Sequence, residues 1–238
     1  TTEIYTLSLH DALPILWDIR KRNIFPMTYP VPSEEICAVC GETVTTWHYI
    51  AYTVFYSDLD GQPRGTGINP HFSIVHQCGK CGYVAFNMST ELPGVEELLK
   101  SDKYREVMNA GFSLDAQKFI CRSIIEEWLG NEKDAGYCLF RATWALGKNQ
   151  GNEHRVKACE LMLKYLPEME EDKQWGNALA VADVYRQASE FSKAKEICEE
   201  WIEKVDKKKK DYFQQELDYI ASFDIDRHRP SGIFKDKE

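Results

Sequence analysis

The feature that most constrains this 238-residue chain is a pair of cysteine knuckles, each with two residues between its cysteines and a glycine after the second. They occupy residues 37–41, Cys-Ala-Val-Cys-Gly, and residues 78–82, Cys-Gly-Lys-Cys-Gly. The two-residue gap lets both thiolates of a pair point at one ion, and the glycine allows the backbone to turn so that amides donate to the sulfurs. Two knuckles supply a closed tetrahedral shell of four thiolates. We predict one structural zinc ion per chain, bound by Cys37, Cys40, Cys78 and Cys81.

A four-sulfur shell has no open position for water or substrate, so the predicted ion is a folding element and not a Lewis acid. An iron centre or a redox-active dithiol is the alternative for the same sulfurs. The other cysteines stand singly on the apolar faces of segments expected to be helical: Cys121, Cys138, Cys159 and Cys198. Free cysteine packs as a small hydrophobic side chain, so we assign these four to the core. The pattern differs from the cross-link framework of small secreted domains.

Strand-like and helical segments occupy separate parts of the chain. Between residues 28 and 92, strands are expected at 43–47, 49–56, 72–77 and 83–86, where Thr, Val, Ile, Tyr and Phe gather between turn residues. Residues 58–70 form a long loop rich in Gly, Pro and Asp. Beyond residue 94, glycine and proline stops predict helices at 95–109, 114–129, 133–146, 153–166, 170–189, 192–206 and 209–222.

The helical part contains a weak internal repeat. Residues 175–185 and the following segment 191–201 resemble one tetratricopeptide (TPR) unit, in which small residues let two helices approach closely. Ala158 in the preceding helix takes the position of Ala194, 36 residues away, which is close to the ~34-residue TPR period. An ordinary helical bundle is the alternative. We therefore predict an α+β fold: a small β-rich zinc ribbon followed by an all-α, TPR-like helical array.

Four segments are expected along the chain: a leader at 1–27, the zinc ribbon at 28–92, the helical region at 93–223 and a flexible, frayed tail at 224–238. Residues 3–15, EIYTLSLHDALPI, resemble the accidental translation of a sequencing-adapter oligonucleotide. We therefore expect the leader to be non-native and the native chain to start at Met27. A short amphipathic helix over 8–19 is the alternative for this segment.

The formal net charge of −9 disfavours a general nucleic-acid binder, because neutralising phosphates requires a basic surface. The ribbon is acidic too: over residues 31–92, Arg64 and Lys80 face six acidic side chains, a net charge of −4. Base stacking on its aromatic side chains is the remaining route to nucleic acid. No stretch approaches the roughly 18 consecutive apolar residues of a membrane span. We expect a cytoplasmic protein with no membrane partner.

A second candidate site, ranked well below the knuckles, consists of Asp58, Asp60 and His71. Paired carboxylates beside an imidazole can bind a divalent ion or act as acid and base. The segment Asp-Leu-Asp-Gly at 58–61 is also typical of an Asx turn, in which aspartate accepts backbone hydrogen bonds, and we favour that interpretation. His76 accompanies the same set, whereas His48 is expected to be a packed or surface side chain. We assign no catalytic residue.

Residues 36–86, with a looser helical similarity up to residue 205, resemble an uncharacterised bacterial domain-of-unknown-function family. Its members carry a CPxCG-type knuckle, an Asp-x-Asp and Asn-Pro loop, a second CxxCGY-A knuckle and a TPR-like tail. Here Ala38 replaces the usual proline of the first knuckle, and Gly79 stands where proline is common in the second. The resemblance implies that the four knuckle cysteines are metal ligands, and it leaves Asp58, Asp60 and Asn69 without a role.

These features favour a cytoplasmic, non-enzymatic scaffold. Zinc fixes the ribbon, and stacked helix pairs present a groove for a peptide or helix of a partner protein. Two alternatives remain open. One is a metal-dependent hydrolase that uses Asp58, Asp60 and His71 around a second ion, and the other is a nucleic-acid-binding zinc ribbon.

Overall fold

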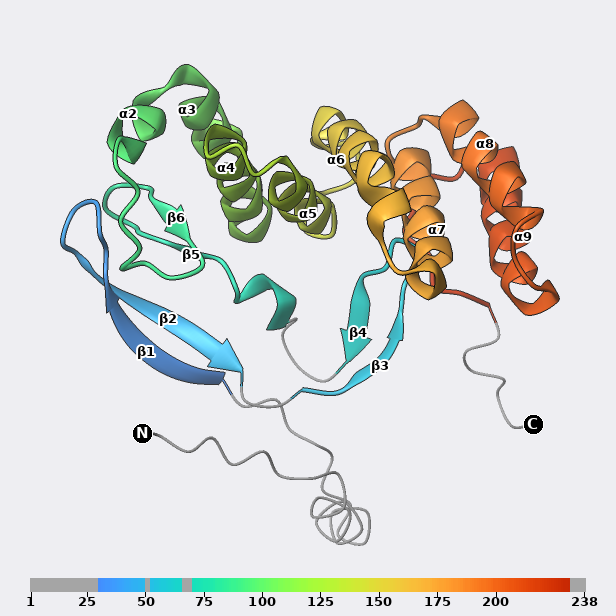
Figure 1. Ribbon diagram of the computed structural model, residues 1–238, viewed down its shortest axis with the longest axis horizontal. Coiled ribbons are helices and arrows are strands. Elements are labelled where there is room, and N and C mark those ends of the chain that lie inside the picture. Colours follow the sequence, from blue (N-terminus) through green and yellow to red (C-terminus); the bar gives the residue numbers. More distant parts are fainter. Residues whose placement is uncertain (1–29, 50–51, 66–69, 232–238) are drawn as a thin grey trace, which may run out of the picture.

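The computed structural model describes residues 30–49, 52–65 and 70–231 (Figure 1). It has the predicted α+β class, because short antiparallel strand pairs precede a long run of helices. The proposed leader at 1–27, residue Asn69 and the last residues of the predicted tail lie outside the described residues.

The strands within these ranges form three separate two-stranded antiparallel hairpins. They are β1 (Pro30–Ile36) with β2 (Thr43–Tyr49), β3 (Val54–Ser57) with β4 (Pro63–Gly65), and β5 (His76–Gln77) with β6 (Val84–Ala85). The first and third hairpins turn at the two cysteine knuckles, and the second turns at residues 58–62. The knuckles therefore form the turns of two separate hairpins instead of lying in one continuous sheet.

Several strand boundaries differ from the sequence prediction. Neither β1 nor β4 was expected, because β1 carries two prolines and β4 is a three-residue strand within the predicted loop. The segment expected as a strand at 72–77 begins instead with the 3-10 turn η1 (Pro70–Phe72), and only its last two residues pair. Proline lacks the amide that a ladder needs, and two-residue strands carry almost no periodic signal.

The helices follow the predicted order and begin and end within four residues of the predicted positions, apart from one division. They are α2 (Val95–Lys100), α3 (Asp102–Asn109), α4 (Leu114–Trp128), α5 (Glu132–Thr143), α6 (Asn152–Tyr165), α7 (Glu171–Gln187), α8 (Phe191–Ile202) and α9 (Lys207–Ala221), with the 3-10 turn η2 (Leu166–Glu168) between α6 and α7. The single helix expected at 95–109 is two, because Ser101 adopts an extended conformation and its side chain caps α3 by accepting from the Tyr104 amide.

Consecutive helices from α4 to α9 pack against one another, and α7 also contacts α9, which places the helices in an arc (Figure 1). Ala158 in α6 and Ala194 in α8, the pair that marked the internal repeat, are both fully buried. A Cβ atom added at Gly136 in α5 would lie 2.9 Å from Leu161 Cβ in α6, so α5 and α6 are in close backbone approach. Helix pairs therefore stack side by side, and α9 ends the array.

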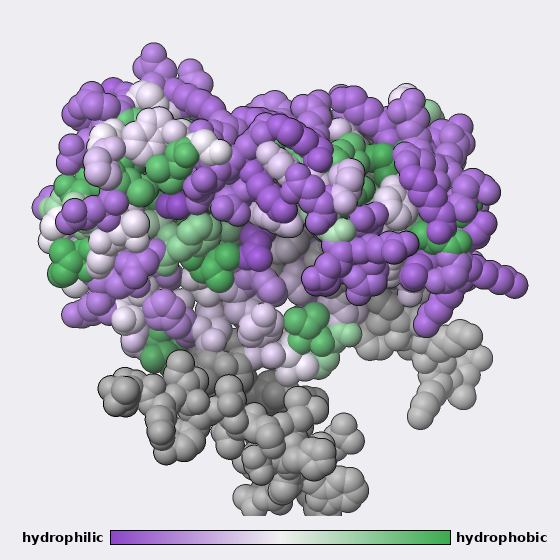
Figure 2. Space-filling model, in the orientation of Figure 1, coloured by the Kyte–Doolittle hydropathy of each residue, from purple (hydrophilic) through white to green (hydrophobic). Residues whose placement is uncertain are grey.

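The β hairpins and the helices share one hydrophobic core. A continuous cluster of buried side chains runs from Cys37 and Tyr83 beside the knuckles through Phe119 in α4 to Phe213 in α9. The Tyr104 hydroxyl on α3 donates to the carbonyl of Gly82 at 2.8 Å, directly beside the second knuckle. Hydrophilic residues cover much of the array on the face shown in Figure 2, with smaller apolar patches between them. The knuckle hairpins thus pack against α3 and α4 and share a core with them.

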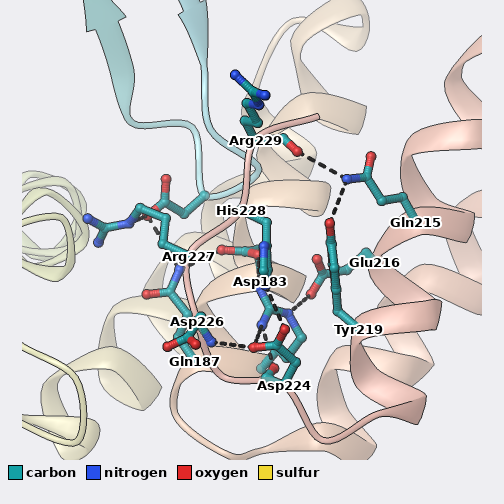
Figure 3. A network of polar contacts seen from close by, with 12 residues as sticks. Asp183, Gln187, Gln215, Glu216, Tyr219, Asp224, Asp226, Arg227, His228 and Arg229 are labelled. Carbon is teal, nitrogen blue, oxygen red and sulfur yellow. Dashed lines mark hydrogen bonds and ion pairs between the residues drawn. The ribbon is translucent and has the colours of Figure 1, made fainter. Parts of the chain in front are cut away.

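The C-terminal segment, residues 224–231, is packed and does not fray as predicted (Figure 3). Its His228 ring stacks on Tyr219 of α9 with centroids 3.8 Å apart, and the His228 carbonyl accepts from the Leu59 amide at 2.9 Å. Arg227 Nε donates to Asp60 Oδ2 at 2.6 Å. The charged segment is held because it supplies the cation for a buried carboxylate in the β3–β4 turn.

Candidate metal centre

The two knuckles bring four sulfur atoms together. Cys37 Sγ lies 3.7 Å from Cys81 Sγ, Cys40 Sγ lies 3.6 Å from Cys78 Sγ, and all four sulfurs are within 4.8 Å of one another. In a tetrahedral shell with metal–sulfur bonds of ~2.3 Å, neighbouring sulfurs are about 3.8 Å apart. The group therefore has the size and donor chemistry to hold a metal ion such as zinc.

Both knuckles adopt the same backbone turn. The Cys37 amide donates to the Glu42 carbonyl at 2.8 Å, and the Cys78 amide donates to the Tyr83 carbonyl at the same distance. In each knuckle the glycine after the second cysteine has a positive φ, 70° at Gly41 and 78° at Gly82. Only glycine adopts this conformation without strain, which explains why each CxxC pair is followed by one.

Backbone amides point at the sulfurs, as the knuckle pattern predicts. The amides of Cys40 and Val39 hydrogen-bond to the Cys37 sulfur, yet burial outweighs them and raises the pKa of the Cys37 thiol. Burial also acts to raise the pKa of Cys78, but the amides of Cys81 and Lys80 outweigh it and hold that pKa below its ordinary value. Metal binding requires thiolates, so an ion that binds here displaces thiol protons.

The environment of the sulfurs is closed on the protein side. Cys37 and Cys78 are buried, whereas Cys40 and Cys81 are half-buried. Lys80 Nζ pairs with Glu42 Oε2 at 3.1 Å across the two knuckles, on the exposed side. A shell of four thiolates has no free coordination position, so it can hold an ion but offers no site for a substrate.

The four single cysteines lie in the helical core, as predicted. All of them are buried: Cys121 in α4, Cys138 in α5, Cys159 in α6 and Cys198 in α8. Burial raises the pKa of Cys121 and of Cys138 to about 12, so these thiols stay protonated at neutral pH. They act as small apolar side chains at helix contacts.

Asp58 and Asp60 lie in the β3–β4 turn, where each pairs with an arginine. Asp58 Oδ2 accepts from Arg64 Nε at 2.6 Å, and Asp60 Oδ2 accepts from Arg227 Nε at 2.6 Å. The amide of Gln62 donates to Asp60 Oδ1 at 2.9 Å, which is the Asx turn that the sequence favours. Burial raises the pKa of Asp58, although Arg64 acts in the opposite direction.

His71 lies in η1, and its ring packs edge-on against Tyr52 and Trp144, with centroids 5.5 and 6.2 Å away. Burial, and after it the charge of Arg141, lowers the pKa of His71. In the described part of the chain, two groups gather three or more metal-ligating side chains, and neither contains Asp58, Asp60 or His71. The structure therefore places this set in a turn and an aromatic contact, apart from any gathered ligand group.

The second ligand group consists of Glu35, His48 and His76. The sequence groups His76 with the aspartates and predicts that His48 is a packed or surface side chain, so it does not indicate this group. The alternation of Val44, Thr46 and His48 is the one local signal for a shared face, but it becomes useful only once β1 is known to pair with β2.

Helices α5, α7 and α9 line a pocket of about 510 Å³, to which the β3–β4 turn and Pro230 also contribute. Its walls are rich in aromatic side chains: Tyr137, Phe140, Trp144, Trp175 and Tyr212. Trp175 stacks on Tyr212 with ring centroids 6.1 Å apart. Arg141 also lines the pocket and is half-buried, and burial lowers the pKa of its guanidinium. Within the residues that the structure describes, no carboxylate forms an ion pair with Arg141.

No protein-family model, curated protein or solved structure matches this chain. In residues 30–49, 52–65 and 70–231, no helix combines the length and the apolar character needed to cross a bilayer. The functional assignment therefore depends on the chemistry of the knuckles and of the pocket.

Proposed function

We propose that this chain is a non-enzymatic protein-interaction module, in which one structural zinc ion fixes the β region and the helical array binds a peptide segment of a partner protein. Four thiolates at tetrahedral spacing are the donor set that structural zinc prefers. The two-residue strands β5 and β6 beside the second knuckle bury too little surface to stand alone, and zinc binding contributes about 10–16 kcal/mol to folding in such segments.

The observation that carries the interaction proposal is the aromatic pocket around Arg141. A half-buried guanidinium without a counter-ion is costly, and a carboxylate brought by a ligand offsets that cost. The aromatic walls offer apolar contact area, and Tyr137 at the pocket remains exposed. Together they favour a peptide that places an acidic group against Arg141 and an apolar side chain against Trp175 or Tyr212.

The chain itself limits the length of this ligand. Leu59 at the tip of the β3–β4 turn is buried, and Trp144 Nε1 donates to the Asp60 carbonyl at 3.1 Å, so the turn already fills part of the space between the helices. A short extended segment fits the remaining pocket better than a long helix.

A larger groove of about 1090 Å³ lies between α7, α8 and the start of α9, but both lysines that line it already have carboxylate partners. Lys204 contacts Glu200, and Lys209 Nζ lies 3.0 Å from Asp206 Oδ2. Lys209 Nζ also lies 5.4 Å from the centre of the Trp175 ring. Because these groups have partners within the chain, this groove provides less drive for binding an anionic ligand than the Arg141 pocket does.

The test is a selection of peptides from a random displayed library on the full zinc-loaded chain, followed by fluorescence anisotropy with the enriched peptides. We expect enriched sequences that combine an acidic and an apolar residue. Arg141→Gln should raise their Kd about tenfold or more, because a hydrogen bond to a charged group contributes about 1.5–3 kcal/mol. The matched control, Arg105→Gln on the exposed face of α3, should leave the Kd unchanged.

Equal binding of the peptides to the wild type and to Arg141→Gln would exclude the pocket as the binding site. If the library yields no enriched peptide, the interaction proposal itself is wrong. A thermal melt followed by circular dichroism shows that Arg141→Gln is folded before its Kd is compared.

A further inference from the structure

A second group of potential metal ligands lies on the hairpins next to the cysteine centre. Glu35 on β1, His48 on β2 and His76 on β5 each offer one ligand atom, and these three atoms lie within 4.8 Å of one another. We propose that they form a second site, which binds a divalent transition-metal ion of the zinc type with two imidazoles and one carboxylate. This site is separate from the proposed peptide-binding function and from the four-thiolate centre.

The hairpin register explains how the ligands meet. Glu35 pairs with Val44 across β1 and β2, and side chains alternate between the two faces of a strand. Thr46 and His48 therefore share the face of Glu35. The third hairpin supplies His76, whose ring lies edge-on to that of His48 with centroids 5.6 Å apart.

Hydrogen bonds fix the carboxylate in place. The amide of Met88 donates to Glu35 Oε2 at 2.6 Å, and the hydroxyl of the fully buried Thr46 donates to Glu35 Oε1 at 2.9 Å. Carboxylates that ligate metals are held by such outer contacts, which orient the lone pairs and reduce the entropy that binding costs. The carboxylate is therefore preorganised before any ion arrives.

The spacing between Glu35 and His48 needs only a small adjustment. Glu35 Oε1 lies 3.9 Å from His48 Nε2. Bonds of about 2.0–2.2 Å to nitrogen and oxygen place neighbouring donors of a tetrahedral shell roughly 3.4 Å apart. The side chain of His48 is 53% exposed, so its ring can move the few tenths of an ångström that are required.

The donor set decides the class of ion. Two imidazoles and one carboxylate suit Zn²⁺, Co²⁺ and Ni²⁺, whereas Mg²⁺ and Ca²⁺ prefer oxygen donors alone. Three protein ligands also leave the fourth position open to water from the exposed side of His48, unlike the closed shell of four sulfurs. The chain would thus hold two metals of different character, one sealed and one open to exchange.

The structure also contains the competing explanation. Thr46 Oγ1 lies 3.2 Å from His48 Nε2, so a hydrogen-bonded chain from His48 through Thr46 to Glu35 accounts for two of the three positions without an ion. That chain does not include His76. Metal titration separates the two explanations.

The experiment is a Co²⁺ titration of the full chain purified with its tightly held zinc. Wild type should bind one equivalent of Co²⁺ with weak visible d–d bands and without the intense charge-transfer band that thiolate ligands produce. His48→Ala, which alters an exposed side chain, should weaken Co²⁺ binding about tenfold or more, and Glu35→Gln should do the same. His154→Ala on α6 is the matched histidine control and should bind as wild type does.

Failure of the wild type to bind Co²⁺ would leave the Thr46 hydrogen-bonded chain as the explanation and overturn the site. Equal binding by wild type and His48→Ala would place the ion elsewhere and overturn it as well. A thiolate charge-transfer band would show that Co²⁺ has entered the cysteine centre, which also contradicts a second site.

Discussion

Arg186 on α7 is fully buried between two carboxylates, Asp183 and Glu216, that are themselves buried. Its Nε donates to Glu216 Oε1 of α9 at 2.7 Å, and its other nitrogens pair with Asp183 and with the carbonyl of Asp224. One guanidinium cannot neutralise two ionised carboxylates, so a proton shared within the group removes the excess charge. Burial, with Asp183 close by, raises the pKa of Glu216 well above its usual range.

This raised pKa predicts a pH-dependent stability that Glu216→Gln should remove. The unfolded chain releases the Glu216 proton near pH 4.3, whereas the folded chain keeps it to higher pH. The stability that the protonated side chain contributes is therefore complete below about pH 4 and is lost as pH rises through the folded pKa. Gln is neutral and of the same shape, so wild type should lose on the order of 1 kcal/mol relative to Glu216→Gln between pH 5 and pH 8.

Urea unfolding followed by circular dichroism at several pH values measures this difference. Glu203→Gln is the control, because Glu203 is exposed after α8 and its variant should follow the wild type at every pH. Parallel stability curves for wild type and Glu216→Gln would mean that Glu216 is ionised in the folded chain.

At the scale of elements, the C-terminal segment ties the β3–β4 turn to the array. Arg227 pairs with the buried carboxylate of Asp60, and its other nitrogens donate to the carbonyls of Trp144 and Thr143 at 3.1 Å. These carbonyls lie at the C-terminal end of α5, where no intrahelical amide remains to pair with them. One side chain thus joins a hairpin turn, a helix end and the C-terminal segment.

Arg227→Gln should destabilise the chain by roughly 3 kcal/mol, because it leaves the Asp60 carboxylate buried without its cation. Urea unfolding gives the magnitude, and limited proteolysis should show new cleavage after α9. The double variant Asp60→Asn with Arg227→Gln should recover part of the loss, since it removes the uncompensated charge.

Lys148→Gln provides the control for this prediction. Lys148 pairs with Asp226 of the same segment, but both side chains are more than half exposed, so its loss should cost less than about 1 kcal/mol. Equal effects of Lys148→Gln and Arg227→Gln would show that the buried contact is no stronger than a surface pair.

Elements with local signals could be predicted from the sequence, and elements with distant partners could not. Helix ends at Gly111 and Gly130 follow from backbone with φ of 72° and 79°, which glycine adopts freely. The same locality identified the cysteine centre, because spacing within each knuckle fixes its geometry. Arg227 and Asp60 are 167 residues apart in the chain, so no local sequence pattern could predict their contact.

The second ligand group was missed for the same reason. Glu35 and His48 share a face only through the register of β1 with β2, and β1 with its prolines does not resemble a strand in sequence. His76 joins them from the β5–β6 hairpin. In this chain, the cysteine centre could be predicted because each pair of its ligands lies within one turn, whereas the second ligand group, assembled from two hairpins, required coordinates.

At the scale of the whole molecule, the predicted boundary between residues 92 and 93 does not separate two cores. Tyr104 of α3 is buried against the second knuckle, and a Cβ at Gly82 would lie 3.3 Å from the terminal methyl of Met108. Helices α7 to α9 contact the rest mainly through their neighbours in the array, as in proteins built from stacked repeats. Loss of the metal should therefore destabilise the helices next to the knuckles strongly and the helices at the far end of the array weakly.

Cys40→Ser tests this gradient. It should abolish zinc retention, and because zinc contributes about 10–16 kcal/mol against a typical total stability of about 5–15 kcal/mol, the knuckle hairpins should unfold. Hydrogen exchange should then lose protection at residues 30–49 and 76–88, fall in α2 to α4, and stay close to wild type in α7 to α9.

Cys198→Ala is the control at the other end of the array, because Cys198 is buried in α8, far along the chain from the knuckles. It creates a small cavity without touching the metal, so zinc content should be unchanged and protection should fall in α7 to α9 instead.

Unchanged protection of α2 to α4 in Cys40→Ser would mean that the ribbon unfolds as an independent domain. Uniform loss across all helices would mean that the chain unfolds as one cooperative unit. The shared core around Tyr104, together with the neighbour-to-neighbour packing of the array, requires the graded result between these two.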